Sequence, residues 1–100
     1  MIIYNVTMKI DLDVHDLWLK WMKEEHIPQV MNTRCFTANK IYHILEENTT
    51  DGISYCFQYF ANEISDYFNY KENFAEGLRN ELQKIFPGKF TAIRTLLREV

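Results

Sequence analysis

The order of hydrophobic periodicities along the chain constrains its fold more than any single motif. Apolar and polar residues alternate with a period of two in four stretches, and apolar residues recur at helical spacing in two others. The order is strand, helix, strand, strand, helix, strand, and it uses almost all of the 100 residues. The chain therefore contains the same strand–helix–strand pattern twice.

The first half of the chain predicts one strand and one helix. Residues 2–10 alternate as a strand, and Asp13 is a natural N-cap for the helix that follows. The apolar stripe of this helix consists of Val14, Leu17, Trp18, Trp21 and Met22. Pro28 cannot donate a backbone hydrogen bond, so we expect the helix to end or kink near His26, with a short turn possible over residues 29–32.

The second half predicts a hairpin, a long helix and a last strand. The expected ranges are 35–46 and 53–60 for the hairpin strands, 47–52 for the turn, 63–86 for the helix and 89–99 for the last strand. Lys71 falls in the apolar stripe of this helix, either because its stem passes along apolar neighbours or because the helix breaks. We favour a break near residues 69–73.

Two strand–helix–strand units with right-handed crossovers form a four-stranded antiparallel sheet in the order 4-1-3-2, with both helices on one face. We therefore expect an α+β, ferredoxin-like βαββαβ fold. A chain of this length is one domain by ordinary size, and we assign residues 1–100 to it.

The face of the sheet without helices predicts an assembly. Its rows hold apolar residues, which we expect to include Ile41, Leu45, Cys56, Phe60, Ile93 and Leu97. Leaving several of them in water forfeits roughly 1.5–3 kcal/mol each. Two sheets packed face to face would cover them, so we expect a homodimer through the helix-free face, which is a dimeric α/β barrel.

Charge and targeting signals narrow the function classes. The net charge is −3, which argues against a nucleic-acid partner. Five basic residues against one acid lie between Arg79 and Arg98, and we interpret them as a solvated helix face and an exposed strand in preference to an anion site. No apolar run is long enough to cross a membrane, and the N-terminus lacks the basic start of a signal peptide. With two cysteines expected to be free, these features predict a cytoplasmic protein.

The candidate site residues lie among the aromatic side chains expected between sheet and helices. His15 and His26 are too far apart along one helix to share an ion, and no metal-binding motif occurs, so we expect no metal. His26 is the candidate catalytic residue, because it stands at a helix end that can border a cavity. Asn5, Trp21 and Tyr59 are the candidate ligand-binding residues, since polar groups among aromatics are typical of small-molecule sites.

The chain also resembles an uncharacterised bacterial family of small stand-alone domains of unknown function. The similar segments are Tyr4–Thr7, Trp18–Pro28, Gln58–Ala61, Phe86–Phe90 and Arg94–Leu97. The resemblance implies membership of the dimeric α/β-barrel superfamily, whose members typically place small apolar ligands between sheet and helices. Haem-degrading members resemble the chain at Asn5 but use a histidine in the second helix. No histidine follows His43 here, so we expect neither haem nor another cofactor.

Three hypotheses for the function remain open. The first is a small-ligand-binding homodimer with an apolar pocket between sheet and helices. The second is a cofactor-independent monooxygenase or isomerase acting on a small aromatic substrate, with His26 as proton acceptor. The third is an interaction module that uses the basic C-terminal strip. An enclosed pocket with His26 or Asn5 at its wall favours the first two, whereas a filled core favours the third.

Overall fold

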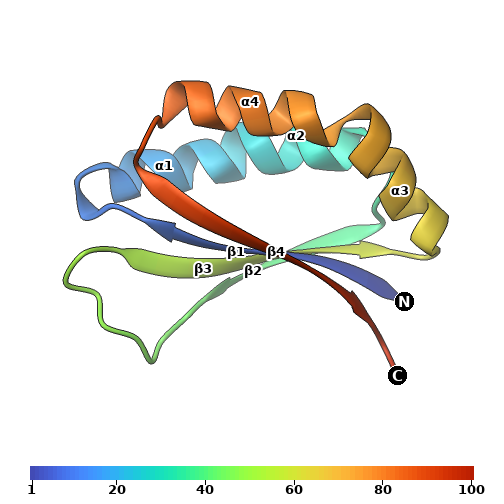
Figure 1. Ribbon diagram of the computed structural model, residues 1–100, viewed down its shortest axis with the longest axis horizontal. Coiled ribbons are helices and arrows are strands. Elements are labelled where there is room, and N and C mark those ends of the chain that lie inside the picture. Colours follow the sequence, from blue (N-terminus) through green and yellow to red (C-terminus); the bar gives the residue numbers. More distant parts are fainter.

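The computed structural model describes residues 1–100 and contains the six expected elements in the expected order (Figure 1). The strands are β1 (Ile2–Ile10), β2 (Ala38–His43), β3 (Ile53–Ala61) and β4 (Phe90–Arg98). Strand β2 is shorter than the sequence predicts, because only backbone bonds from Thr37 and Ile44 to β3 extend it. The other strands agree with their predicted ranges to within one residue at each end.

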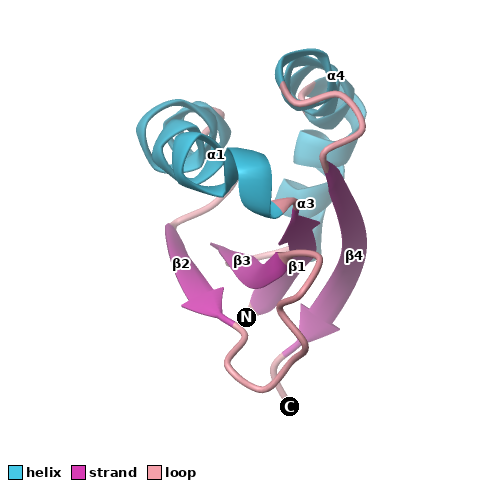
Figure 2. Ribbon diagram, turned by 90° about the vertical axis from the view of Figure 1, so that its left-hand side faces the viewer, coloured by secondary structure: helices cyan, strands magenta, loops and turns pink.

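The sheet has the order β2-β3-β1-β4, which is the predicted order read from the other edge. All three neighbouring pairs are antiparallel, with Val6 opposite Phe57 on one side and opposite Arg94 on the other. The helices lie together on one face of this sheet (Figure 2). The predicted sheet order and the placement of the helices on one face are therefore confirmed.

The first helical segment continues beyond the point where the sequence predicts an end or a kink. A 3-10 turn (Leu12–Val14) leads into α1 (His15–Trp21), a π turn (Met22–His26) and then α2 (Ile27–Asn32). Pro28 lacks the N–H that would bond one turn back, and its ring crowds the carbonyl there. The wider π turn just before it accommodates both effects, with the Ile27 N–H bonded to the Met22 carbonyl. The sequence therefore located the irregularity correctly, but the chain stays helical through it.

The second helical segment is interrupted, as the sequence favours. Helix α3 (Ile64–Asn73) and helix α4 (Ala75–Ile85) are separated at Phe74, whose backbone leaves the helical region. The interruption resets the apolar stripe, which explains why Lys71 stays exposed while Tyr70, Ala75 and Leu82 are buried.

The core occupies the space between the sheet and the helices. Alternate residues of β1 and β3 point toward the helices and are buried, including Tyr4, Val6, Phe57 and Tyr59. Trp18 of α1 is completely buried against Phe57, with ring centroids 5.7 Å apart. None of the helices is long and apolar enough to cross a membrane.

The helix-free face differs in part from the expectation. Cys56, Phe60, Ile93 and Leu97 belong to it, because they share its alternation with Ile3 and Thr7 of β1. Ile41 does not, since it pairs with Phe57 and packs against the core, and Leu45 lies beyond the end of β2. The alternation along the strand was interpreted correctly. The register of β2 places Ile41 on the helix side, and the early end of the strand leaves Leu45 outside the sheet.

Candidate functional site

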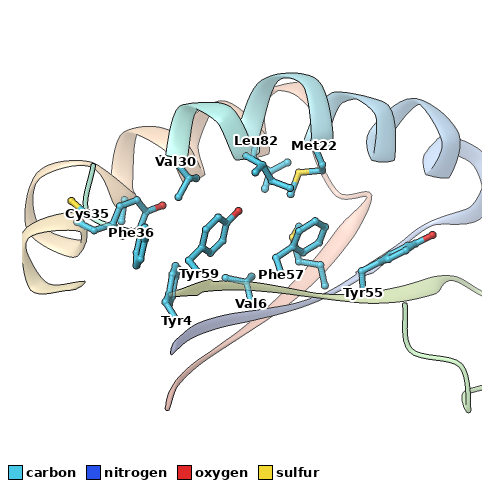
Figure 3. Close-up of a cluster of buried hydrophobic side chains, with 14 of the residues drawn as sticks. Tyr4, Val6, Met22, Val30, Cys35, Phe36, Tyr55, Phe57, Tyr59 and Leu82 are labelled. Carbon is cyan, nitrogen blue, oxygen red and sulfur yellow. The ribbon is translucent and has the colours of Figure 1, made fainter. Parts of the chain in front are cut away.

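A small, partly enclosed cavity lies between the sheet and the helices. Strands β1, β3 and β4 supply its floor, and the π turn, α3 and α4 supply its roof. Figure 3 shows Val6, Phe57 and Tyr59 rising from the strands toward Met22 and Leu82 of the helices. The cavity volume is about 30 Å³, which is space for one or two water molecules. The core is therefore not completely filled at this point.

Tyr59 of β3 brings a buried hydroxyl to the cavity. Only 3% of the side chain is exposed, and its hydroxyl has no hydrogen-bond partner in the protein. The hydroxyl points toward the helix layer (Figure 3). Burial raises the pKa of Tyr59 above its ordinary value of 10, so the group keeps its proton and can donate it in a hydrogen bond.

His26 reaches the cavity from the end of the π turn. Its Nδ1 atom is buried and unpartnered, and its ring lies 5.6 Å from the ring of Trp21, measured between centroids. Burial and, next, the positive charge of Arg94 lower the pKa of His26 from its ordinary value of 6.5 to about 4. The imidazole is therefore neutral at pH 7. Wide helical turns of this kind are frequent at functional sites.

Two arginines line the same cavity. Arg79 comes from α4 and Arg94 from β4, and the Nε atom of Arg79 is buried without a partner. The ion pairs of the chain involve Lys9, His15 and Lys89, so neither guanidinium has a carboxylate within salt-bridge distance. The cavity thus combines an apolar wall with unpaired positive charge.

A surface groove between α4 and β4 adjoins the cavity. Its volume is about 340 Å³, and it shares Arg79, Leu82 and Arg94 with the cavity lining. Phe90 and Ala92 of β4 add apolar surface to it. The two arginines therefore stand at the border between the partly enclosed cavity and the open groove.

A second cluster of polar aromatic residues lies at the other end of the helix layer. Tyr55 stacks between His15 and His43, and its hydroxyl is 2.7 Å from Nε2 of His15. The Nδ1 atom of His15 lies 2.8 Å from a carboxylate oxygen of Asp16. These groups satisfy one another, unlike those of the cavity. No three His, Cys, Asp or Glu side chains are grouped so that they could hold a metal ion.

The structure brings together some of the residues selected from the sequence. His26 and Tyr59 both line the cavity. The ring of Trp21 packs against that of His26 but is not part of the cavity lining. Asn5 lies on the opposite, helix-free face, where its Nδ2 donates to the Thr7 hydroxyl at 3.1 Å. Asn5 was expected in the pocket as a polar group among the aromatic side chains, but it alternates with the core-facing residues of β1 and therefore points away from the cavity.

Three further residues line the cavity without having been predicted there from the sequence: Tyr70, Arg79 and Arg94. A signal existed for Arg94, since it interrupts the row Phe90, Ala92, Leu96 of β4 that shares a face with Val6. Tyr70 was hidden by the helix break, which shifts the stripe at that point. Arg79 carries no local signal, because a charged residue beside an apolar stripe is ordinary in a surface helix.

Comparison with known proteins identifies a family and a fold. A family model described as a domain of unknown function, DUF4286, matches residues 1–100. No curated protein matches the chain. Solved structures with the same arrangement include an ethyl tert-butyl ether d (EthD) family protein from Bacillus halodurans, with a TM-score of 0.68, 11% identity and complete coverage of both chains.

Two further structures are similar over nearly their whole length. HapK from Hahella chejuensis has a TM-score of 0.71 and 9% identity, and the match covers 100% of this chain and 93% of HapK. SnoaB, a cofactor-independent oxygenase from Streptomyces nogalater, has a TM-score of 0.61 and 6% identity, with 98% and 92% covered. At these identities the likeness shows the ferredoxin-like fold.

Proposed function

The chain belongs to the DUF4286 family, and we propose that it is a small-ligand-binding homodimer with its pocket between the sheet and the helices. The observation that supports this proposal is the cavity with three unpartnered polar atoms, on His26, Tyr59 and Arg79. A buried donor without a partner costs about 1–3 kcal/mol. A ligand in this cavity would supply the missing partners and offset this cost.

The homodimer is supported by the helix-free face. Ile93 is 69% exposed, and Leu97 and Tyr42 on the same face are also exposed. Ile3, Cys56 and Phe60 are half-buried beside them. A contiguous apolar patch on one face of a sheet is typical of an interface, and a second copy of the same sheet is its simplest complement.

Native mass spectrometry of protein purified without denaturation tests both parts of this proposal. We expect the mass of a dimer, with an additional small mass where a ligand has been retained. A monomer at micromolar concentration would contradict the homodimer. The pocket is tested separately by the binding of small aromatic probes, followed through the methyl groups of Met8 and Met22, which both line the cavity.

A second candidate function is a cofactor-independent monooxygenase or isomerase for a small aromatic substrate. The observation that favours it is a neutral His26 beside Arg94 in a water-poor cavity. His26 would accept a proton from the substrate, and the guanidinium would stabilise the negative charge that develops. SnoaB, with the same fold, is a cofactor-independent oxygenase.

Deuterium exchange separates catalysis from simple binding. Phenylpyruvate has an acidic C–H next to its carbonyl, and exchange of this hydrogen with solvent reports proton abstraction. An enzyme of this type would accelerate the exchange, and His26→Asn would reduce the acceleration at least about 100-fold. Equal exchange rates with and without the protein would leave binding as the function.

A further inference from the structure

Three side chains of the cavity lining carry buried polar atoms without a partner, and these atoms can donate hydrogen bonds. The Tyr59 hydroxyl and the Arg79 Nε–H are donors, and Nδ1 of neutral His26 donates in one of its tautomers. Three side chains of one cavity lining that carry such donors favour a ligand group that accepts hydrogen bonds. Because one of them is a guanidinium, an anionic acceptor gains most from this site.

The charge of the site agrees with this selection. No Asp or Glu is among the residues that line the cavity or the groove, and both include Arg79 and Arg94. The protein as a whole has a net charge of −3. The surplus of positive charge is therefore local to the cavity and the groove.

The volumes indicate how large the anionic group is. A cavity of about 30 Å³ holds one or two water-sized atoms, which corresponds to the two oxygens of a carboxylate. The body of the ligand has space in the adjoining groove of about 340 Å³, over Leu82, Phe90 and Ala92. The planar guanidinium and the planar carboxylate also match in geometry.

We propose that this site binds a small molecule with a carboxylate, which enters the cavity between Arg79, Tyr59 and His26 while its apolar body lies in the groove between α4 and β4. Arg94 stands at the border and contributes charge. The proposal rests on the ligand-binding function proposed above and adds the chemical class of the ligand. It also reverses our first interpretation of two basic residues of the C-terminal half as merely solvated.

The test compares phenylacetate with its neutral amide, phenylacetamide. Binding is followed by NMR of protein labelled with ¹³C at the methionine methyl groups. We expect phenylacetate to shift the signals of Met8 and Met22, which line the cavity, and to leave exposed Met1 unchanged. The amide should bind at least about 10-fold more weakly, because it lacks the charge that the guanidinium stabilises.

Variants of the arginines locate the anionic group. Arg79→Gln and Arg94→Gln should each weaken phenylacetate binding, by about 10-fold for Arg79. The matched control is Arg98→Gln, because Arg98 lies on the same strand and face as Arg94 but lines neither cavity nor groove. Should an arginine variant not fold, the comparison of acid and amide on the unchanged protein decides by itself.

A second readout does not depend on variants. A bound carboxylate next to His26 favours the charged imidazole, so the pKa of His26 should rise from about 4 when phenylacetate is present. A rise caused by the amide as well would contradict an electrostatic origin. The ring signals of His26 in an NMR titration report this pKa directly.

The outcomes separate the two proposals. Equal binding of acid and amide at Met8 and Met22 would overturn the carboxylate and retain the pocket. Binding of inorganic phosphate without binding of phenylacetate would overturn the carboxylate in favour of another anion. Absence of any shift at Met8 and Met22 with all three probes would overturn both the carboxylate and the pocket.

Discussion

At the scale of single residues, His26 links the stability of the fold to pH. Its pKa is about 4 in the folded protein and about 6.5 in the unfolded chain, because only the folded protein buries it beside Arg94. The unfolded chain therefore binds a proton below pH 6.5 that the folded protein does not yet bind. Stability is complete above pH 6.5 and is lost as the pH falls toward about 4.

We expect the free energy of unfolding to decrease by about 2 kcal/mol between pH 8 and pH 5 through His26. Chemical denaturation at a series of pH values measures it. The variant His26→Asn should lose this dependence. Below pH 5 the lowered pKa values of Glu47 and Asp51 add their own dependence, so the comparison is made above it. An unchanged slope in the variant would contradict the burial of His26.

Two buried tyrosines of β3, one in the cavity lining and one outside it, allow the cost of an unpartnered hydroxyl to be measured. The hydroxyl of Tyr55 is bonded to His15, whereas that of Tyr59 has no partner in the protein. We expect Tyr55→Phe to reduce the free energy of unfolding by about 1 kcal/mol and Tyr59→Phe to reduce it less or to increase it. Thermal and denaturant unfolding of the two variants measure the difference. A larger loss for Tyr59→Phe would mean that ordered water satisfies its hydroxyl.

The residues of the site differ in how far the sequence could predict them. Tyr59 and His26 were accessible, because one alternates with core residues and the other stands next to a proline that disturbs its helix. Asn5 was misplaced because period-two alternation assigns a residue to one of two faces without saying which face the helices cover. Arg79 required the packing of α4 against β4, which no local pattern encodes.

At the scale of elements, Gly77 and Gly88 allow the backbone conformation of α4 and of the turn after it to be tested by substitution. Gly77 lies inside α4 with open space around it, and Gly88 in the turn before β4 has a φ of +70°. We expect Gly77→Ala to raise the free energy of unfolding by about 0.5–1 kcal/mol through the lower entropy of the unfolded chain. Gly88→Ala should lower it by about 1 kcal/mol, because alanine is strained in the left-handed region.

Denaturant unfolding of the two glycine variants measures both effects on the same scale. Effects of equal sign would contradict the assignment of Gly77 to a regular helix or of Gly88 to a left-handed turn. The elements themselves were largely predictable, because strong periodicity decides their type. The π turn was not, since Pro28 indicates a disturbance without saying whether the helix ends or widens.

At the scale of the whole molecule, two helical segments on one face leave the other face of the sheet without cover. The sequence predicted this because two crossover helices of the same hand lie on the same side. Figure 1 shows the helices above the sheet and none below it. The residues of the free face depend on the register of β2, which explains why Ile41 was assigned to the wrong side.

The homodimer is tested by two leucine-sized residues of equal exposure. Ile93 on the helix-free face is 69% exposed, and Leu17 on α1 is 67% exposed. We expect Ile93→Lys to convert a dimer to a monomer at micromolar concentration, because a buried ammonium in an apolar interface has no partner. Leu17→Lys should leave the dimer intact. Sedimentation velocity of the unchanged protein and both variants measures the assembly.

The pocket gives this experiment a second readout. The cavity lies on the helix side of the sheet and is lined by one chain alone, so the monomer made by Ile93→Lys should still bind phenylacetate. Loss of binding together with the dimer would mean that the second copy holds the sheet in the shape that the cavity needs. Equal disruption by Ile93→Lys and Leu17→Lys would instead place the interface on the helices and contradict the face-to-face arrangement of the two sheets.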